Sequence, residues 1–130
     1  LLDRIDLHIE VPPVEYEQLS SKKASESSAA ILERVNAARA VQLERFKGTS
    51  VTSNAHIPAG MLRQVCNMTD AASAMLRDVF DRMGLSARAY DRLLKVARTI
   101  ADLAQSEIIE TPHLAEAVQY RSLDRKYWRR

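Results

Sequence analysis

A chain of 130 residues is long enough for one domain with a buried core, because chains of this size remove roughly two-thirds of their unfolded surface from water. The apolar fraction of 46% comes mainly from aliphatic residues, with only 5% aromatics, a mixture that favours helices over aromatic-rich sheets. No apolar run approaches the roughly 20 residues that cross a bilayer, and no secretion signal opens the chain, so we expect a soluble protein without a membrane partner.

The charge distribution and the cysteine content indicate the kind of partner and the compartment to expect. The net charge of +2 is uneven, because the last ten residues carry +4 and the first 120 residues carry −2. A basic tail can contact phosphates or acidic partners, although a solvated terminus is the simpler interpretation. The single Cys66 cannot form an internal disulfide, which fits a reducing compartment and makes the cytoplasm the expected location.

The chain opens with a pattern typical of a β-strand. Apolar and polar side chains alternate over residues 5–11, the period of a strand with one buried face, and Pro12 and Pro13 end it. Residues 14–24 have no sustained apolar period and are interpreted as a surface linker. Because the chain begins with Leu1 instead of Met, directly on an apolar segment, we expect it to be a fragment of a longer protein.

About five helices are predicted after the linker. Their expected positions are residues 26–47, a short helix from Pro58 to about Asn67, a helix from the cap Thr69 to Gly84, a helix after the cap Ser86, and a last helix starting at Thr111 and Pro112. Ile108 and Ile109 are expected to form a short extended connection before the last helix.

The helix after Ser86 has the clearest amphipathic pattern in the chain. Its predicted apolar stripe consists of Tyr90, Leu93, Leu94, Ala97, Ile100, Ala101 and Ala104. Four charged residues, Arg88, Arg92, Lys95 and Asp102, are predicted to project from the opposite side.

Two kinds of chemistry are excluded or disfavoured by the residues themselves. Only three glycines are present and none belongs to a phosphate-binding loop, so nucleotide hydrolysis by this chain alone is excluded. The three histidines and Cys66 lack metal-ligand spacing, so no metal site is expected. Cys66 shares a short predicted helix with apolar residues and is interpreted as a small buried hydrophobe, not as a nucleophile.

Two arginines stand out by position. Arg4 lies just before the predicted strand, and Arg88 lies in the first turn of the most amphipathic helix. The planar guanidinium fork matches phosphate oxygens, and an arginine at the edge of a subunit can reach a neighbour's nucleotide. Chemistry alone leaves open whether either arginine does this or forms an ordinary surface ion pair.

Sequence motifs add a family resemblance. LLDRIDLHIEVP at residues 1–12 resembles the end of the AAA+ core in the magnesium-chelatase-like group. NAARAVQ at residues 36–42 with Arg45, LSARAYDRLLKVARTIADL at residues 85–103, and HLAEAVQYR at residues 113–121 resemble the ComM competence family. The resemblance implies a mainly α-helical bundle of the AAA+ C-terminal lid type, preceded by one short strand. Residues 1–12 would be the remnant of the core strand, residues 13–25 the linker, and residues 26–130 the lid.

The resemblance also implies roles for individual residues. Arg4 would be an arginine finger acting across the subunit interface, and Arg88 would be the sensor-2 residue, which contacts ATP bound with Mg²⁺ in the same subunit. The longer protein would be a homo-hexameric helicase or branch-migration motor that acts on branched or single-stranded DNA during natural transformation. The fragment would hold no cofactor and would not be catalytic itself. Candidate DNA contacts in the tail are Arg125, Lys126, Arg129 and Arg130.

Two other interpretations remain open at this point. One is a helical interaction module that binds partner proteins and never meets nucleotide, which should present a contiguous apolar groove. The other is the lid of a true magnesium-chelatase subunit, which helps to insert Mg²⁺ into a porphyrin. The lid interpretation predicts instead that Arg4 and Arg88 face a shared exposed edge.

Overall fold

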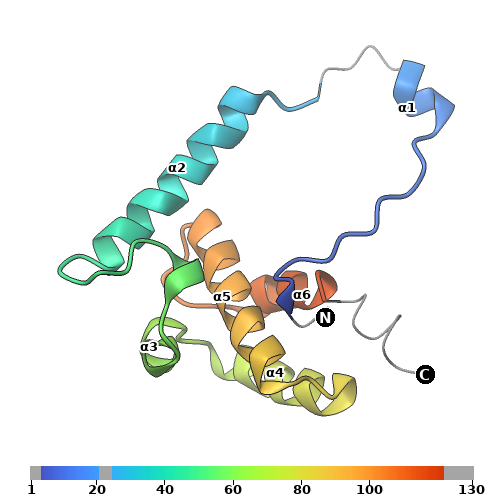
Figure 1. Cartoon of the computed structure of the whole chain (residues 1–130). Helices are drawn as coiled ribbons and strands as arrows, with labels where there is room; N and C mark the ends of the chain where they lie inside the picture. Colours follow the sequence, from blue (N-terminus) through green and yellow to red (C-terminus); the bar gives the residue numbers. More distant parts are fainter. Residues whose placement is uncertain (1–3, 21–24, 122–130) are drawn as a thin grey trace.

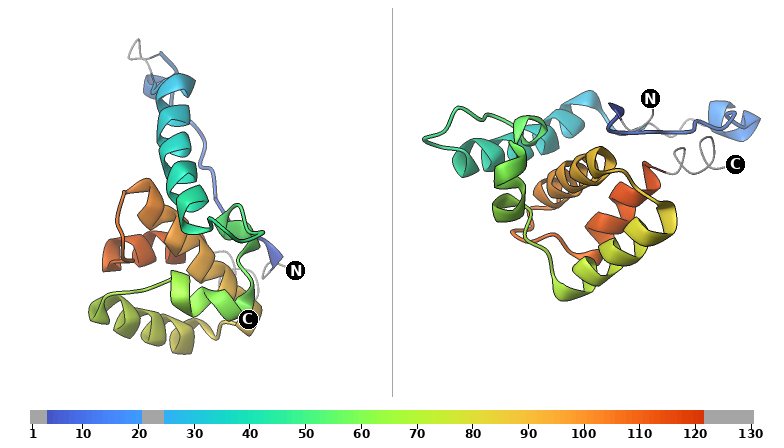
Figure 2. Two further views of the ribbon diagram at one scale, coloured as in Figure 1. Left: turned by 90° about the vertical axis from the view of Figure 1, so that its left-hand side faces the viewer. Right: turned by 60° about the horizontal axis from the view of Figure 1, so that its bottom comes forward.

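The computed structural model describes residues 4–20 and 25–121, which are mainly helical (Figure 1). The elements follow in the order α1 (Tyr16–Ser20), α2 (Ser28–Arg45), the 3₁₀ turn η2 (Asn54–His56), α3 (Ala59–Val65), α4 (Asp70–Met83), α5 (Ala87–Leu103) and α6 (Thr111–Gln119). α5 runs through the middle of the body and packs against α2, η2, α3 and α6, while α4 packs against α6 (Figure 1 and Figure 2). The predicted mainly α-helical fold is confirmed.

Local sequence signals fix the ends of several helices. Ser27, Thr69 and Ser86 each accept a hydrogen bond of 3.1 Å from the backbone N–H three residues further on, which satisfies a donor that the helix itself cannot pair. Gly84 ends α4 at φ 61°, in the left-handed region that side chains rarely adopt. The predicted caps at Thr69 and Ser86 and the stop at Gly84 are therefore confirmed.

The hydrophobic core forms around α5. Four residues of its predicted stripe, Leu93, Leu94, Ala97 and Ala101, are buried, while Tyr90 and Ile100 are half-buried and pack against the core from its edge. Ala104 is exposed. The core is completed by buried residues from the surrounding elements: Phe46, Ile57, Leu62, Cys66, Ala72, Leu76, Val79, Leu85, Ile109, Leu114 and Ala117. The helical period of the sequence thus identified the face of α5 that enters the core.

A parallel β-bridge joins the loops on either side of the α4–α5 pair. Ile109 N–H donates to the Asn67 carbonyl at 2.9 Å, and Thr69 N–H donates to the Ile109 carbonyl at 3.1 Å. Ile109 is fully buried at this point. The extended connection predicted at Ile108 and Ile109 is confirmed, and it fastens the start of α4 to the start of α6.

The strand predicted over residues 5–11 does not form. A strand needs a neighbour that pairs with its backbone groups, and the described chain brings none beside this segment. His8 N–H donates instead to the Tyr120 carbonyl at 2.7 Å, and the apolar side chains of the segment are exposed. The helix α1 lies inside residues 13–25, which were predicted to be a linker.

Helix α2 differs from the rest of the body because it stands away from it over much of its length (Figure 1 and Figure 2). Only Ala38 and Gln42 are buried within it, whereas Ile31 and Val35, which share the predicted apolar face, are exposed. Across the described ranges, no helix has both the length and the apolar character that a bilayer crossing requires.

Candidate functional site

Arg88 is the second residue of α5 and lies in its first turn, two residues after the cap Ser86. Its side chain is exposed. Within the part of the chain that the structure describes, the Arg88 side chain has no hydrogen bond or ion pair. The N-terminal end of a helix carries a partial positive charge, so Arg88 adds its own charge to a field that already attracts anions.

Arg88 opens onto a surface hollow of about 310 Å³. The hollow is lined by Asp6, Ala55, Arg88, Asp91, Arg92 and Lys95. Its three basic residues follow one another along one face of α5 at spacings of four and three residues, which are neighbours on a helix surface. Lys95 Nζ donates to the Ala55 carbonyl at 3.3 Å, and Arg92 forms an ion pair with Asp6. The hollow therefore combines three cations with two carboxylates, and its cationic side comes entirely from α5.

Arg4 lies at the start of the described chain and is exposed. The segment after it is held against the body, because Asp6 pairs with Arg92 on α5 and the buried Arg121 guanidinium donates to the Ile5 and Asp6 carbonyls. Arg4 is thus two residues from a wall of the hollow that contains Arg88. Asp6, two residues after Arg4, lines the same hollow as Arg88.

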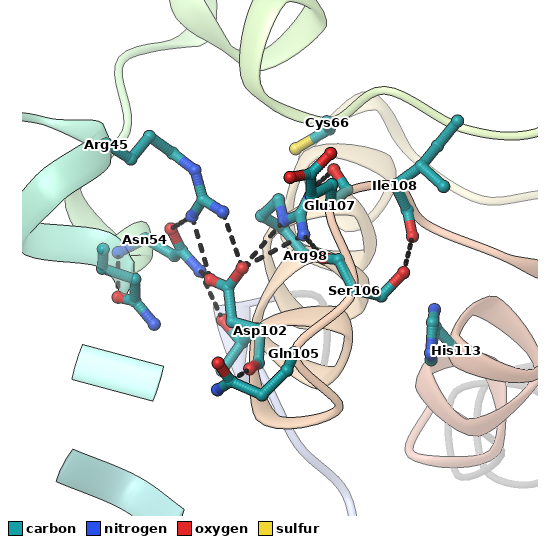
Figure 3. Close-up of polar contacts among 12 residues, drawn as sticks. Arg45, Asn54, Cys66, Arg98, Asp102, Gln105, Ser106, Glu107, Ile108 and His113 are labelled. Atoms are coloured by element: carbon teal, nitrogen blue, oxygen red, sulfur yellow. Dashed lines mark hydrogen bonds and ion pairs between the residues drawn. The ribbon is translucent and has the colours of Figure 1, made fainter. Parts of the chain in front are cut away.

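A second group of polar residues lies buried toward the C-terminal end of α5 (Figure 3). Asp102, which the sequence pattern predicted on the exposed side, is fully buried. Arg45 of α2 donates to its carboxylate through two nitrogens, at 2.6 and 2.9 Å, and Asn54 Nδ2 donates at 2.9 Å. The exposed position predicted for Asp102 is wrong, because partners distant in sequence make its burial possible.

Arg98 completes this buried network. Its Nε donates to Asp102 Oδ1 at 3.2 Å, and its two terminal nitrogens donate to the carbonyls of Ser106 at 2.6 Å and Glu107 at 3.0 Å (Figure 3). Burial lowers the pKa of the Arg98 guanidinium, and the neighbouring Asp102 carboxylate raises it. With its donors paired inside the protein, Arg98 fastens the α5–α6 loop to α5. Sequence analysis missed this role, although the four-residue spacing from Arg98 to Asp102 signals a pair.

Cys66 behaves as the sequence predicted. It is buried, and its Sγ lies 3.8 Å from the Leu94 carbonyl. Burial raises the pKa of the thiol from 9.0 to about 11, although Arg98 and Arg45 act in the opposite direction. A thiol with so high a pKa is a poor nucleophile at neutral pH.

The remaining predicted positions divide into structural and undescribed residues. His113 Nδ1 accepts the Glu110 N–H at 3.0 Å and so caps α6. Among residues 4–20 and 25–121, no group of three His, Cys, Asp or Glu side chains gathers where a metal ion could be held. The tail residues Arg125, Lys126, Arg129 and Arg130 lie outside the described residues. Arg121, which the sequence grouped with that basic tail, is buried.

Comparison with known proteins gives a family to this arrangement. Residues 25–121 match the family described as magnesium chelatase, subunit ChlI C-terminal. The chain is 44% identical over 125 residues to the uncharacterised protein YifB of Escherichia coli and 40% identical over 125 residues to the competence protein ComM of Haemophilus influenzae. An uncharacterised protein of Mycobacterium bovis is 32% identical over 121 residues.

The matches cover 95% of this chain for the first two relatives and 93% for the third, but they span only 24% of the length of each relative. The match over residues 25–121 includes α2 to α6 and therefore Arg88, Arg92 and the buried network. The chain belongs to the magnesium chelatase ChlI C-terminal family and corresponds to this domain of the ComM and YifB proteins.

Proposed function

We propose that this chain is the C-terminal lid of a ring-forming AAA+ ATPase, in which Arg88 contacts the phosphates of ATP bound to the same subunit. The observation that carries the proposal is the hollow at the start of α5, where Arg88 is exposed, has no partner in the described chain, and lies beside two further cations. A lid needs no phosphate-binding loop of its own. The loop, and with it ATP and Mg²⁺, would belong to the remaining part of the longer protein.

The residues of the hollow fit phosphate oxygens. A guanidinium presents a planar fork that can donate two parallel hydrogen bonds, and the N-terminal field of α5 adds to its charge. Arg92 and Lys95 lie along the same face, so the positive charge extends over about two turns of the helix. Arg88 would hold the phosphate oxygens of the bound nucleotide. The position of α5 would then depend on whether nucleotide is bound.

Arg4 is proposed to act on the nucleotide of the neighbouring subunit. Its side chain is exposed, while the Ile5 carbonyl accepts from Arg121 and the Asp6 carboxylate pairs with Arg92. An exposed guanidinium beside a held segment suits a group that must reach across an interface. Arginines supplied in trans to phosphoryl transfer accelerate it by roughly 10³–10⁵.

The longer protein is proposed to be a homo-hexameric motor acting on branched or single-stranded DNA in the cytoplasm. The 40% identity to a competence protein supports a role connected with DNA uptake. The basic tail residues Arg125, Lys126, Arg129 and Arg130 would contribute phosphate contacts. A chelatase lid is the alternative within the same family, and it predicts that porphyrin, instead of DNA, stimulates the ATPase.

One observation favours the interaction module as a second candidate. A groove of about 440 Å³ between α3, α4 and α5 has Met68, Leu76, Phe80 and Tyr90 among its lining residues. Apolar grooves of this kind accept partner helices or peptides. This candidate predicts that Arg88 has no influence on nucleotide binding.

The test is ATPase activity of the full-length protein, with and without branched DNA and with porphyrin in a parallel series. Arg4→Ala should lower turnover by roughly 10³-fold or more while ATP affinity persists, because the trans arginine acts on the transition state. Arg88→Ala should weaken ATP binding or uncouple hydrolysis from DNA. Arg82→Ala, which removes an exposed arginine of α4, is the matched control and should change neither. Unchanged ATP affinity and turnover in Arg88→Ala would favour the interaction module.

A further inference from the structure

We propose that the ion pair between Asp6 and Arg92 positions Arg4 relative to Arg88, so that the lid helix carries the trans-acting arginine with it. This inference rests on the proposed function. It assigns a positioning role to two residues that the family resemblance left without one. Neither residue needs to touch nucleotide for the role to hold.

The first support is the place of the pair in the chain. Arg92 lies one helical turn after Arg88 on the same face of α5, and both line the same hollow. Asp6 lies two residues after Arg4. The pair therefore joins the segment that bears the trans arginine to the helix that bears the cis arginine, across 86 residues of sequence.

The second support is that backbone groups of this segment hold it to the end of α6. The Arg121 guanidinium donates to the Ile5 and Asp6 carbonyls, and His8 N–H donates to the Tyr120 carbonyl at 2.7 Å. These contacts fix the segment to the end of α6. The Asp6 carboxylate adds a link to α5, so a shift of α5 on nucleotide binding would be transmitted to Arg4 through this side chain.

The third support is energetic. The side chains of Arg92 and Asp6 are 31% and 53% exposed, and exposed ion pairs contribute little to stability because water and salt screen them. Neither residue belongs to the hydrophobic core. Loss of the pair should therefore leave the fold intact, which allows its effect on catalysis to be measured separately.

A purely electrostatic role for Asp6 makes the opposite prediction. Asp6 places a negative charge in a hollow proposed for phosphate, so its removal should tighten ATP binding and leave turnover equal or higher. A positioning role predicts lower turnover with equal or tighter ATP binding. The sign of the change in turnover separates the two.

The experiment uses the full-length protein with Asp6→Ala, and with Arg82→Ala as an ion-pair control on α4. Turnover in Asp6→Ala should fall on the order of 10- to 100-fold, since small misplacements of catalytic groups have effects of this size. ATP affinity and the melting temperature should stay unchanged or rise. The reversed pair, Asp6→Arg with Arg92→Asp, should recover part of the lost turnover, whereas each reversed single variant should not.

Mixed rings assign the defect to one side of the interface. Subunits with Arg88→Ala keep a normal Arg4, so mixing them with Asp6→Ala subunits should recover activity at interfaces that combine the two intact sides. Mixing Asp6→Ala with Arg4→Ala should recover none, because both variants damage the same side. Recovery in this second mixture would overturn the inference.

The controls keep this inference separate from the proposed function. If Arg4→Ala itself leaves turnover unchanged, the trans role of Arg4 fails and the inference fails with it. If Arg4→Ala abolishes turnover but Asp6→Ala leaves it at the level of Arg82→Ala, only the inference is overturned.

Discussion

Arg88 and Arg98 lie ten residues apart on the same helix, and their surroundings differ completely. Arg98 is 2% exposed and donates to the Asp102 carboxylate and to two backbone carbonyls. Arg88 is exposed, faces a hollow with other cations, and has no partner in the described chain. A buried arginine must be paired to offset desolvation, so its bonding capacity is used inside the fold. An arginine left without internal partners keeps that capacity for a ligand.

Substitution of Asp102, the carboxylate that pairs with Arg98, should have the largest effect on stability. Asp102→Ala leaves Arg98 buried without its carboxylate, which should lower the free energy of unfolding by about 3–5 kcal/mol. Urea denaturation of the chain measures this change. Arg88→Ala is the matched control on the same helix and should stay within about 0.5 kcal/mol of the unmodified protein. Equal losses for the two variants would contradict the division of α5 into a structural and an available arginine.

The free energy of unfolding should depend on pH through the buried thiol of Cys66. The folded thiol of Cys66 has a pKa raised from 9.0 to about 11 by burial. Below pH 9 both states hold the proton, so the full stability is present. Between these values the unfolded chain loses its proton first, and the free energy of unfolding should fall by roughly 2–3 kcal/mol.

The measurement compares urea unfolding at about pH 8 and about pH 10.5 for the protein and for Cys66→Ala, since other groups also titrate in this range. The loss attributed to Cys66 is the difference between the two proteins. In the native state the thiol should also react slowly with alkylating reagents. A thiol that reacts at neutral pH as fast as in the unfolded chain would contradict its burial beside the network.

Sequence patterns predicted the parts of this molecule that depend on neighbours along the chain. Thr69, Ser86 and Gly84 act within one helical turn, so their roles could be identified from residue type and spacing. Asp102 could not, because its burial depends on Arg45, which lies 57 residues away. The strand over residues 5–11 failed for a related reason, since an alternating pattern describes a strand only where a second strand is present to pair with it.

The candidate site also has a part that the sequence predicts and a part that it does not. The position of Arg88 after a cap, together with the family motif, selects it as a candidate from the sequence, and its role stays a prediction. The hollow around it was not predictable, because one wall comes from Asp6 and another from Ala55, both distant in sequence from α5. The turn containing Ala55 is held in place from behind, where Asn54 N–H donates to Gln42 Oε1 at 3.0 Å.

The smallest predicted effect concerns the first turn of α5, which the cap Ser86 holds and which contains Arg88. Ser86→Ala removes the hydrogen bond to the Ala89 N–H and should lower the free energy of unfolding by about 1 kcal/mol. Because Arg88 lies in that turn, fraying should also weaken ATP binding by the full-length protein. Ser73→Ala, an exposed serine inside α4, is the control and should do neither. Loss of stability without weaker ATP binding would show that the position of Arg88 does not depend on its helix end.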